Sequence, residues 1–143
     1  MRLLLVDDGS VLGDALGRSL APEHDIRRLS DARDRAAVAA ALAGRQAAIL
    51  VVPSVVGADE AAIDALDRAG RGAYNVLTAD GPALPRLILV TSLRPFARYP
   101  VGWRVDESWM PRPTAEVADL APYLAEIAAR EVSRVRPTEV VLL

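Results

Sequence analysis

The side chains that could carry out chemistry are few in this sequence, and several common types are missing. All 17 basic residues among the 143 are arginine, lysine and cysteine are absent, and His24 is the single histidine. A lysine Schiff base, a P-loop lysine, a cysteine nucleophile, a thiolate zinc site and a histidine cluster are therefore excluded. We predict no metal site.

Two adjacent acids, Asp7 and Asp8, follow the apolar run 3–6, and Gly9 and Gly13 come next. Carboxylate oxygens can hold Mg²⁺, but two adjacent acids more often favour the start of the following helix. A strand, a glycine-containing turn and a helix are typical of a dinucleotide-binding unit. We interpret the spacing of Gly9, Gly13 and Gly17 as structural rather than phosphate-binding.

The elements that position these residues alternate between short apolar runs and segments with helical periodicity. The strands are predicted at 2–6, 24–29, 47–52, 87–91 and 139–143. The helices are predicted at 11–20, 34–43, 59–79 with an interruption at Gly70 and Gly72, and 122–135 with Pro122 in the first turn. This alternation predicts a single Rossmann-like three-layer α/β/α domain over residues 1–143, with about five parallel strands.

Residues 93–113 contain four prolines, both tryptophans, Phe96 and Tyr99, and show no clear period. This pattern predicts a long loop, and such loops are usually functional or linker-like. The aromatic residues could form a small satellite core over the edge of the sheet. Alternatively, they could form a patch that faces a ligand or partner.

The composition restricts the partners. Arginine is nearly balanced by 19 acidic residues, so the sequence has no basic stripe of the kind that binds nucleic acid or an anionic membrane. No apolar run approaches the roughly 20 residues of a membrane span, and the N-terminus lacks a signal-peptide pattern. We expect a cytoplasmic protein.

Five motifs along the chain are similar to those of one enzyme family. They are 6–13 (VDDGSVLG), 31–34 (DARD), 73–77 (AYNVL), 106–114 (DESWMPRPT) and Tyr123. The chain resembles the NAD-dependent epimerase/dehydratase family, the extended short-chain dehydrogenases/reductases, which has VTGGSGFLG, DLxD, GTxNVL, DExxPxPxS/T and YxxxK at these places. The resemblance implies NAD or NADP at Gly9, Ser10, Gly13 and Asp31, with Asp31 on the adenine, and catalysis by Tyr123 with Ser92.

The positions that matter most for this chemistry depart from the family pattern. Asp8 occupies the first glycine position, so two carboxylates would face the pyrophosphate. Ile127 stands at i+4 from Tyr123, where the family has the lysine whose charge lowers the tyrosine pKa. Ser92 matches the catalytic Ser/Thr only after a one-residue shift, because Leu93 takes that position otherwise. We therefore expect NAD(P) binding to be weak or lost.

The resemblance implies two further differences from the family. We expect that a deletion merges the second and third strands of the family and that the domain lacks the C-terminal substrate-binding part. We predict a degenerate NAD(P)-binding domain that acts as a nucleotide or metabolite binder, or as a structural or regulatory module. In the family, dimers form through the helices that correspond to 59–79 and 122–135, so we expect a homodimer with Ala62, Leu66, Leu124 and Ala128 in the seam.

Two alternatives remain. The first is an active NAD(P)-dependent oxidoreductase or epimerase acting on a sugar-nucleotide-like substrate. The second is a receiver-like pseudo-domain, because Asp7 and Asp8 after the first strand also resemble a response-regulator receiver. A receiver needs an aspartate after the third strand and a lysine before the last helix, and this chain has Pro53-Ser54 and Arg112.

Overall fold

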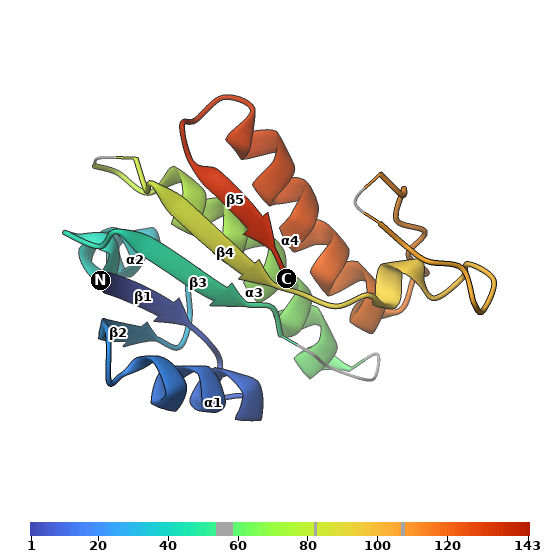
Figure 1. The fold of residues 1–143 in the computed structure, drawn as a ribbon, viewed down its shortest axis with the longest axis horizontal. Coiled ribbons are helices and arrows are strands. Elements are labelled where there is room, and N and C mark those ends of the chain that lie inside the picture. Colours follow the sequence, from blue (N-terminus) through green and yellow to red (C-terminus); the bar gives the residue numbers. More distant parts are fainter. Residues whose placement is uncertain (54–58, 82, 107) are drawn as a thin grey trace.

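The computed structural model describes residues 1–53, 59–81, 83–106 and 108–143. Glu107 of the motif at 106–114, and Ser54, which stands where a receiver would need its aspartate, lie outside the described residues. Strands and helices alternate as predicted (Figure 1). The elements are β1 (Arg2–Val6), α1 (Val11–Leu20), β2 (Asp25–Leu29), α2 (Arg35–Leu42), β3 (Ala47–Val51), α3 (Glu60–Thr78), β4 (Arg86–Val90), the short 3₁₀ helix η1 (Arg94–Phe96), α4 (Val117–Ser133) and β5 (Glu139–Leu142).

The five strands form one parallel sheet in the order β2-β1-β3-β4-β5, which confirms the predicted Rossmann-like fold class. This is the order of a Rossmann sheet without its third strand, and it is also the order of flavodoxin-like sheets. The order reverses between β1 and β3. Ligands of open α/β sheets bind at such a switch point, beside the carboxyl ends of the strands, so a ligand site is expected in this crevice.

The helices are distributed unequally over the two faces of the sheet (Figure 1). On one face, α2, α3 and α4 pack on Leu4, Leu50 and Leu89, which are almost completely buried. On the other face, α1 contributes Leu16 and Leu20 to a smaller core. The central strands therefore contain buried Leu, Ile, Val and Ala on both faces, as expected for a parallel sheet.

Side-chain caps fix where three of the helices begin. The Ser10 hydroxyl accepts a hydrogen bond from the N–H of Gly13 at the start of α1. Asp34 accepts from two N–H groups of α2, and Asp59 accepts from the N–H of Ala62 in α3. Such caps satisfy amide groups that have no partner within the first turn.

The predicted interruption at Gly70 and Gly72 is wrong, because α3 runs unbroken through both residues. A β-carbon on Gly70 would lie 3.8 Å from the Cβ of Leu124 in α4, and one on Gly72 would lie 3.5 Å from the Cβ of Ala32. Both glycines therefore lie on sides of α3 that face neighbouring parts of the chain, at ordinary packing distances. Packing of α3 outweighs the low helix propensity of glycine.

The predicted place of Pro122 in the first turn is also wrong, because α4 begins at Val117 and Pro122 lies inside the helix. Proline there removes one helical hydrogen bond. The helix continues because Ala121, Ala125 and Ala129 are buried against the rest of the core. The remaining differences are shifts of one residue at strand ends and of one or two residues at helix ends, within the usual variation of element boundaries.

The predicted aromatic cluster forms in part. Tyr99 and Trp109 meet edge to face with ring centroids 4.5 Å apart, and Trp103 meets Trp109 at 5.5 Å. The Arg112 guanidinium lies 4.4 Å from the centre of the Tyr99 ring. Phe96 instead lines a cavity beside β4, described below.

Candidate functional site

The turn between β1 and α1 is closed by the chain's own carboxylate. Asp7 is 4% exposed, and its carboxylate accepts hydrogen bonds from the N–H of Gly9 at 3.0 Å, the N–H of Ser10 at 3.3 Å and the Ser10 hydroxyl at 2.5 Å. Arg28 of β2 pairs with the same carboxylate at 3.2 Å. An anion is therefore already present at the start of α1, where the helix dipole favours negative charge.

Gly9 and Gly13 have different roles in this turn. Gly9 has a φ of +92°, a left-handed conformation that glycine adopts without strain. Gly13 lies directly over Asp7, so that a β-carbon there would be 1.9 Å from the Asp7 Cγ. In this structure, Gly13 makes room for the carboxylate that closes the turn.

Asp31, which the resemblance places on adenine, is bonded to Arg33. The Asp31 carboxylate accepts from the Arg33 Nε at 3.0 Å, from its Nη2 at 2.5 Å and from its backbone N–H at 2.9 Å. The hydrogen bonds from Arg33 hold the pKa of Asp31 below its usual range. Arg33 also pairs with Asp64 of α3, so it ties the loop after β2 to that helix.

A second contact between α3 and the same loop comes from an asparagine. Asn75 of α3 is 6% exposed, and its amide nitrogen donates to the carbonyls of Ala32 at 2.9 Å and Arg33 at 2.8 Å. Asn75 comes from the AYNVL motif and Asp31 from the DARD motif, so the structure brings these two motifs together.

The space at the switch point is open but acidic. A cavity of about 370 Å³ there is lined by Asp8, Gly9, Ser10, Leu12, Val51 and Val52. Asp8 and Asp31 also line a smaller hollow of about 20 Å³ beside it. A dinucleotide placed here would bring its phosphates close to the carboxylates of Asp7 and Asp8.

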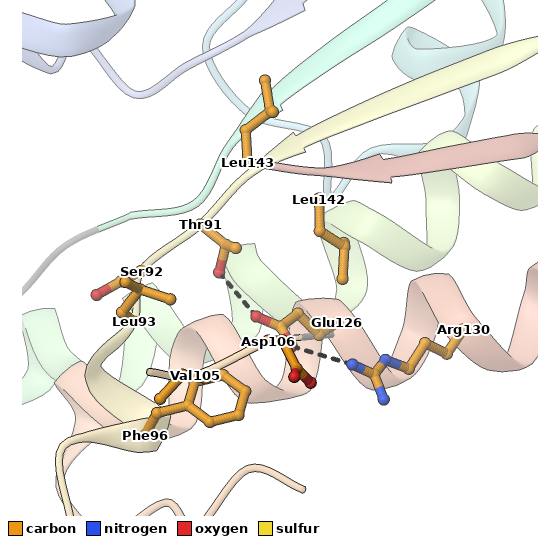
Figure 2. Close-up of a pocket in the computed structure, with 10 residues that line it drawn as sticks. All are labelled: Thr91, Ser92, Leu93, Phe96, Val105, Asp106, Glu126, Arg130, Leu142 and Leu143. Atoms are coloured by element: carbon orange, nitrogen blue, oxygen red, sulfur yellow. Dashed lines mark hydrogen bonds and ion pairs between the residues drawn. The ribbon is translucent and has the colours of Figure 1, made fainter. Parts of the chain in front are cut away.

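The residues predicted to carry out catalysis are not brought to one cavity. Ser92 follows β4 and lines a cavity of about 300 Å³ between β4, β5 and α4 (Figure 2). Tyr123 is half-buried on α4, and it is not among the residues that line this cavity. Ile127, one turn further along α4, is 38% exposed.

The cavity contains a residue that the motifs did not indicate. Glu126 of α4 is 4% exposed, and burial raises the pKa of its carboxyl group. The Thr91 hydroxyl donates to Glu126 at 3.3 Å, and the Arg130 guanidinium lies 4.0 Å away (Figure 2). An acid next to Ala125 and three residues before Ala129, on the apolar side of a helix, was the signal that could have identified it.

Two further properties concern metals and membranes. Within the described ranges, no three His, Asp or Glu side chains gather in the way that would hold a metal ion. Among the helices that the structure describes, none is long and apolar enough to cross a bilayer.

No protein-family model matches the sequence, and no curated protein matches it. Solved structures do match. A short-chain dehydrogenase/reductase superfamily protein from Agrobacterium tumefaciens with bound NAD is 18% identical with a TM-score of 0.82, and the match covers 99% of this chain and 48% of that protein. UDP-glucose 4-epimerase from Thermus thermophilus in complex with NAD is 16% identical with a TM-score of 0.78, over 99% of this chain and 54% of the epimerase.

Uronate dehydrogenase from Agrobacterium tumefaciens is 21% identical with a TM-score of 0.79, over 97% of this chain and 58% of the dehydrogenase. The chain thus spans about half the length of these proteins. At such identities the likeness shows the fold, and at that level the resemblance predicted from the motifs is confirmed.

Proposed function

We propose that this chain is an epimerase/dehydratase-like Rossmann domain that no longer carries out dehydrogenase chemistry, and that it acts as a metabolite-binding or structural and regulatory dimer module. The observation that supports this most strongly is the Asp7 carboxylate, which takes the hydrogen bonds of Gly9 and Ser10 at the start of α1. In a dinucleotide-binding fold, the pyrophosphate uses donors at this place.

Two further observations support weak or lost NAD(P) binding. Asp31 is bonded to Arg33 on both carboxylate oxygens, so adenine would have to compete with an ion pair. Asp8 is exposed beside the cavity at the switch point and adds a second negative charge there. A pyrophosphate would therefore meet repulsion where the fold normally supplies attraction.

Calorimetric titration with NAD⁺, NADH, NADP⁺ and NADPH is expected to show no dissociation constant below about 0.1 mM. A dehydrogenase titrated with the same cofactor solutions serves as the positive control. A micromolar dissociation constant would contradict the proposal. It would favour the active alternative, in which Tyr123 and Ser92 act on a sugar-nucleotide-like substrate.

The loss of chemistry rests on the surroundings of Tyr123. An acid/base tyrosine needs a nearby cation that lowers its pKa, and a lysine at i+4 would supply it from the same face of the helix. This chain has Ile127 there. Arg130, two turns along, lies beside Glu126 instead.

The proposed dimer uses the outer side of α3 and α4. Ile63, Gly70 and Tyr74 share one side of α3, and Gly70 lies against Leu124 of α4. Ile63 is 66% exposed and Leu124 is 39% exposed. Ala62, expected in the seam, is instead fully buried within the chain together with Val117. The exposed apolar strip is then Ile63, Tyr74, Leu124 and Ile127.

Replacing Leu124 with glutamate is expected to convert a dimer into a monomer, because each symmetric contact would bring charge into an apolar seam on both subunits. Sedimentation velocity measures the change in mass. Val11→Glu is the matched control, since Val11 is 87% exposed on α1, on the other face of the sheet. A monomeric parent protein at about 100 µM would refute the dimer.

A further inference from the structure

Three buried acids in this structure differ in how well their charge is compensated. Asp7 accepts four hydrogen bonds, as described above. Asp119 of α4 accepts three, from the Arg94 Nε at 2.9 Å and from the Thr114 N–H and hydroxyl at 3.1 and 2.8 Å. Buried carboxylates are normally satisfied in this way, because an unpaired buried charge is costly.

Glu126 is as buried as these two acids but has much poorer partners. Within the part of the chain that the structure describes, it accepts one hydrogen bond, from the Thr91 hydroxyl at 3.3 Å. This is longer than ordinary O–H···O hydrogen bonds. The Arg130 guanidinium is at the limit of an ion pair, at 4.0 Å, and its side chain is 47% exposed. The Glu126 carboxylate is therefore buried and could accept further hydrogen bonds.

The Glu126 carboxylate faces a cavity of about 300 Å³ (Figure 2). The cavity is within the size range of small-molecule sites. Most of its lining is apolar, from Leu93, Phe96, Val105, Leu142 and Leu143, and Asp106 adds a second carboxylate. Two carboxylates against the single guanidinium of Arg130 leave the lining with a net negative charge, so an anionic ligand is disfavoured.

We propose that this cavity binds a small primary amine, with its ammonium group bonded to the Glu126 carboxylate and its apolar part against Phe96 and the leucines. An ammonium group supplies both the positive charge and the donors that Glu126 lacks. A ring or alkyl body fits the apolar lining, and Phe96 can also face the cation. This inference rests on the metabolite-binding part of the proposed function and names its ligand class.

The test uses three probes of similar shape and different charge: 2-phenylethylamine, 2-phenylethanol and 3-phenylpropanoate. Amide resonances of Thr91, Ser92 and Arg130 report binding in ¹H–¹⁵N NMR titrations. We expect the amine to saturate with a dissociation constant below about 1 mM. The alcohol should bind at least about tenfold more weakly, because it forms no charge-assisted hydrogen bond.

Glu126→Gln should weaken the amine about tenfold and leave the alcohol unchanged. The alcohol therefore shows whether the cavity survives the substitution. Glu131→Gln is the matched control, because Glu131 is on the same helix, exposed, and paired with Arg134 outside the cavity.

Equal affinity for amine and alcohol, preference for the carboxylate, an unchanged amine affinity in Glu126→Gln, or no shifts up to about 10 mM would each overturn the inference. The outcome of the NAD(P) titration is independent of the outcome of the amine titration. A micromolar NAD complex would overturn the proposed loss of cofactor and leave the amine result standing.

Discussion

Gly13→Ala is expected to destabilise the fold by about 3 kcal/mol, at the upper end of what overpacking usually costs. The new β-carbon would lie 1.9 Å from the Cγ of Asp7. Asp7 cannot move aside cheaply, because its carboxylate holds the N–H groups of Gly9 and Ser10 and the Arg28 guanidinium. Urea denaturation followed by circular dichroism measures the change.

Gly17→Ala is the matched control on the same helix. Its β-carbon would meet Leu5 Cδ2 at 3.5 Å, an ordinary contact. It should therefore be neutral or should stabilise the protein by up to about 1 kcal/mol through helix propensity. If Gly13→Ala unfolds at the same urea concentration as Gly17→Ala, the close approach of Asp7 and Gly13 is incorrect.

The double variant Asp7→Ala/Gly13→Ala provides a test that does not depend on the absolute loss. Asp7→Ala alone should destabilise the protein, since it leaves the turn without its acceptor. Once the carboxylate is gone, the added methyl group at position 13 has room. The double variant should thus be more stable than the sum of the two single losses predicts, by at least about 1 kcal/mol.

Asn75→Asp is expected to cost about 3 kcal/mol although it hardly changes the size of the side chain, because one buried and one partly buried carbonyl group would each lose a donor. Aspartate would also face the carbonyls of Ala32 and Arg33 with an acceptor where the amide donates. Differential scanning calorimetry at pH 7 measures the loss.

Asn75→Ala separates hydrogen bonding from charge. It removes the donors without adding a carboxylate, so it should destabilise the protein less than Asn75→Asp. Arg71→Ala, on the same helix and with a side chain that is 60% exposed in a surface ion pair, should have a small effect. An Asn75→Asp protein as stable as the parent would show that the amide does not hold the 32–33 backbone.

The success of the sequence-based predictions depended on how local each signal was. The strand at Ala47–Val51 could be predicted from its continuous apolar run between turn residues, because a strand buried on both faces has this composition. The unbroken α3 could not, because the low helix propensity of Gly70 is offset by the burial of Ala69, Ala73 and Val76 against parts of the chain that are distant in the sequence.

The candidate site follows the same rule. The sequence indicated that Asp7 and Asp8 would repel a pyrophosphate, and this needed only their place after a strand. That the Asp7 carboxylate folds back onto Gly9 and Ser10 depends on side-chain geometry that no motif contains. Glu126 was missed because its importance comes from a cavity that four separate segments form.

The two edges of the sheet have unequal protection against other chains. At the β2 edge, Arg27 reaches the Ala40 carbonyl and Arg28 reaches Asp14, so charged side chains cover the strand. The β5 edge has apolar side chains at 140–142, and its outer backbone groups have no neighbouring strand among the described residues. Uncovered apolar edges are where sheets of different molecules join. Within the described residues, β5 is therefore the edge that is open to pairing with a further strand, and the arginines of β2 protect the opposite edge.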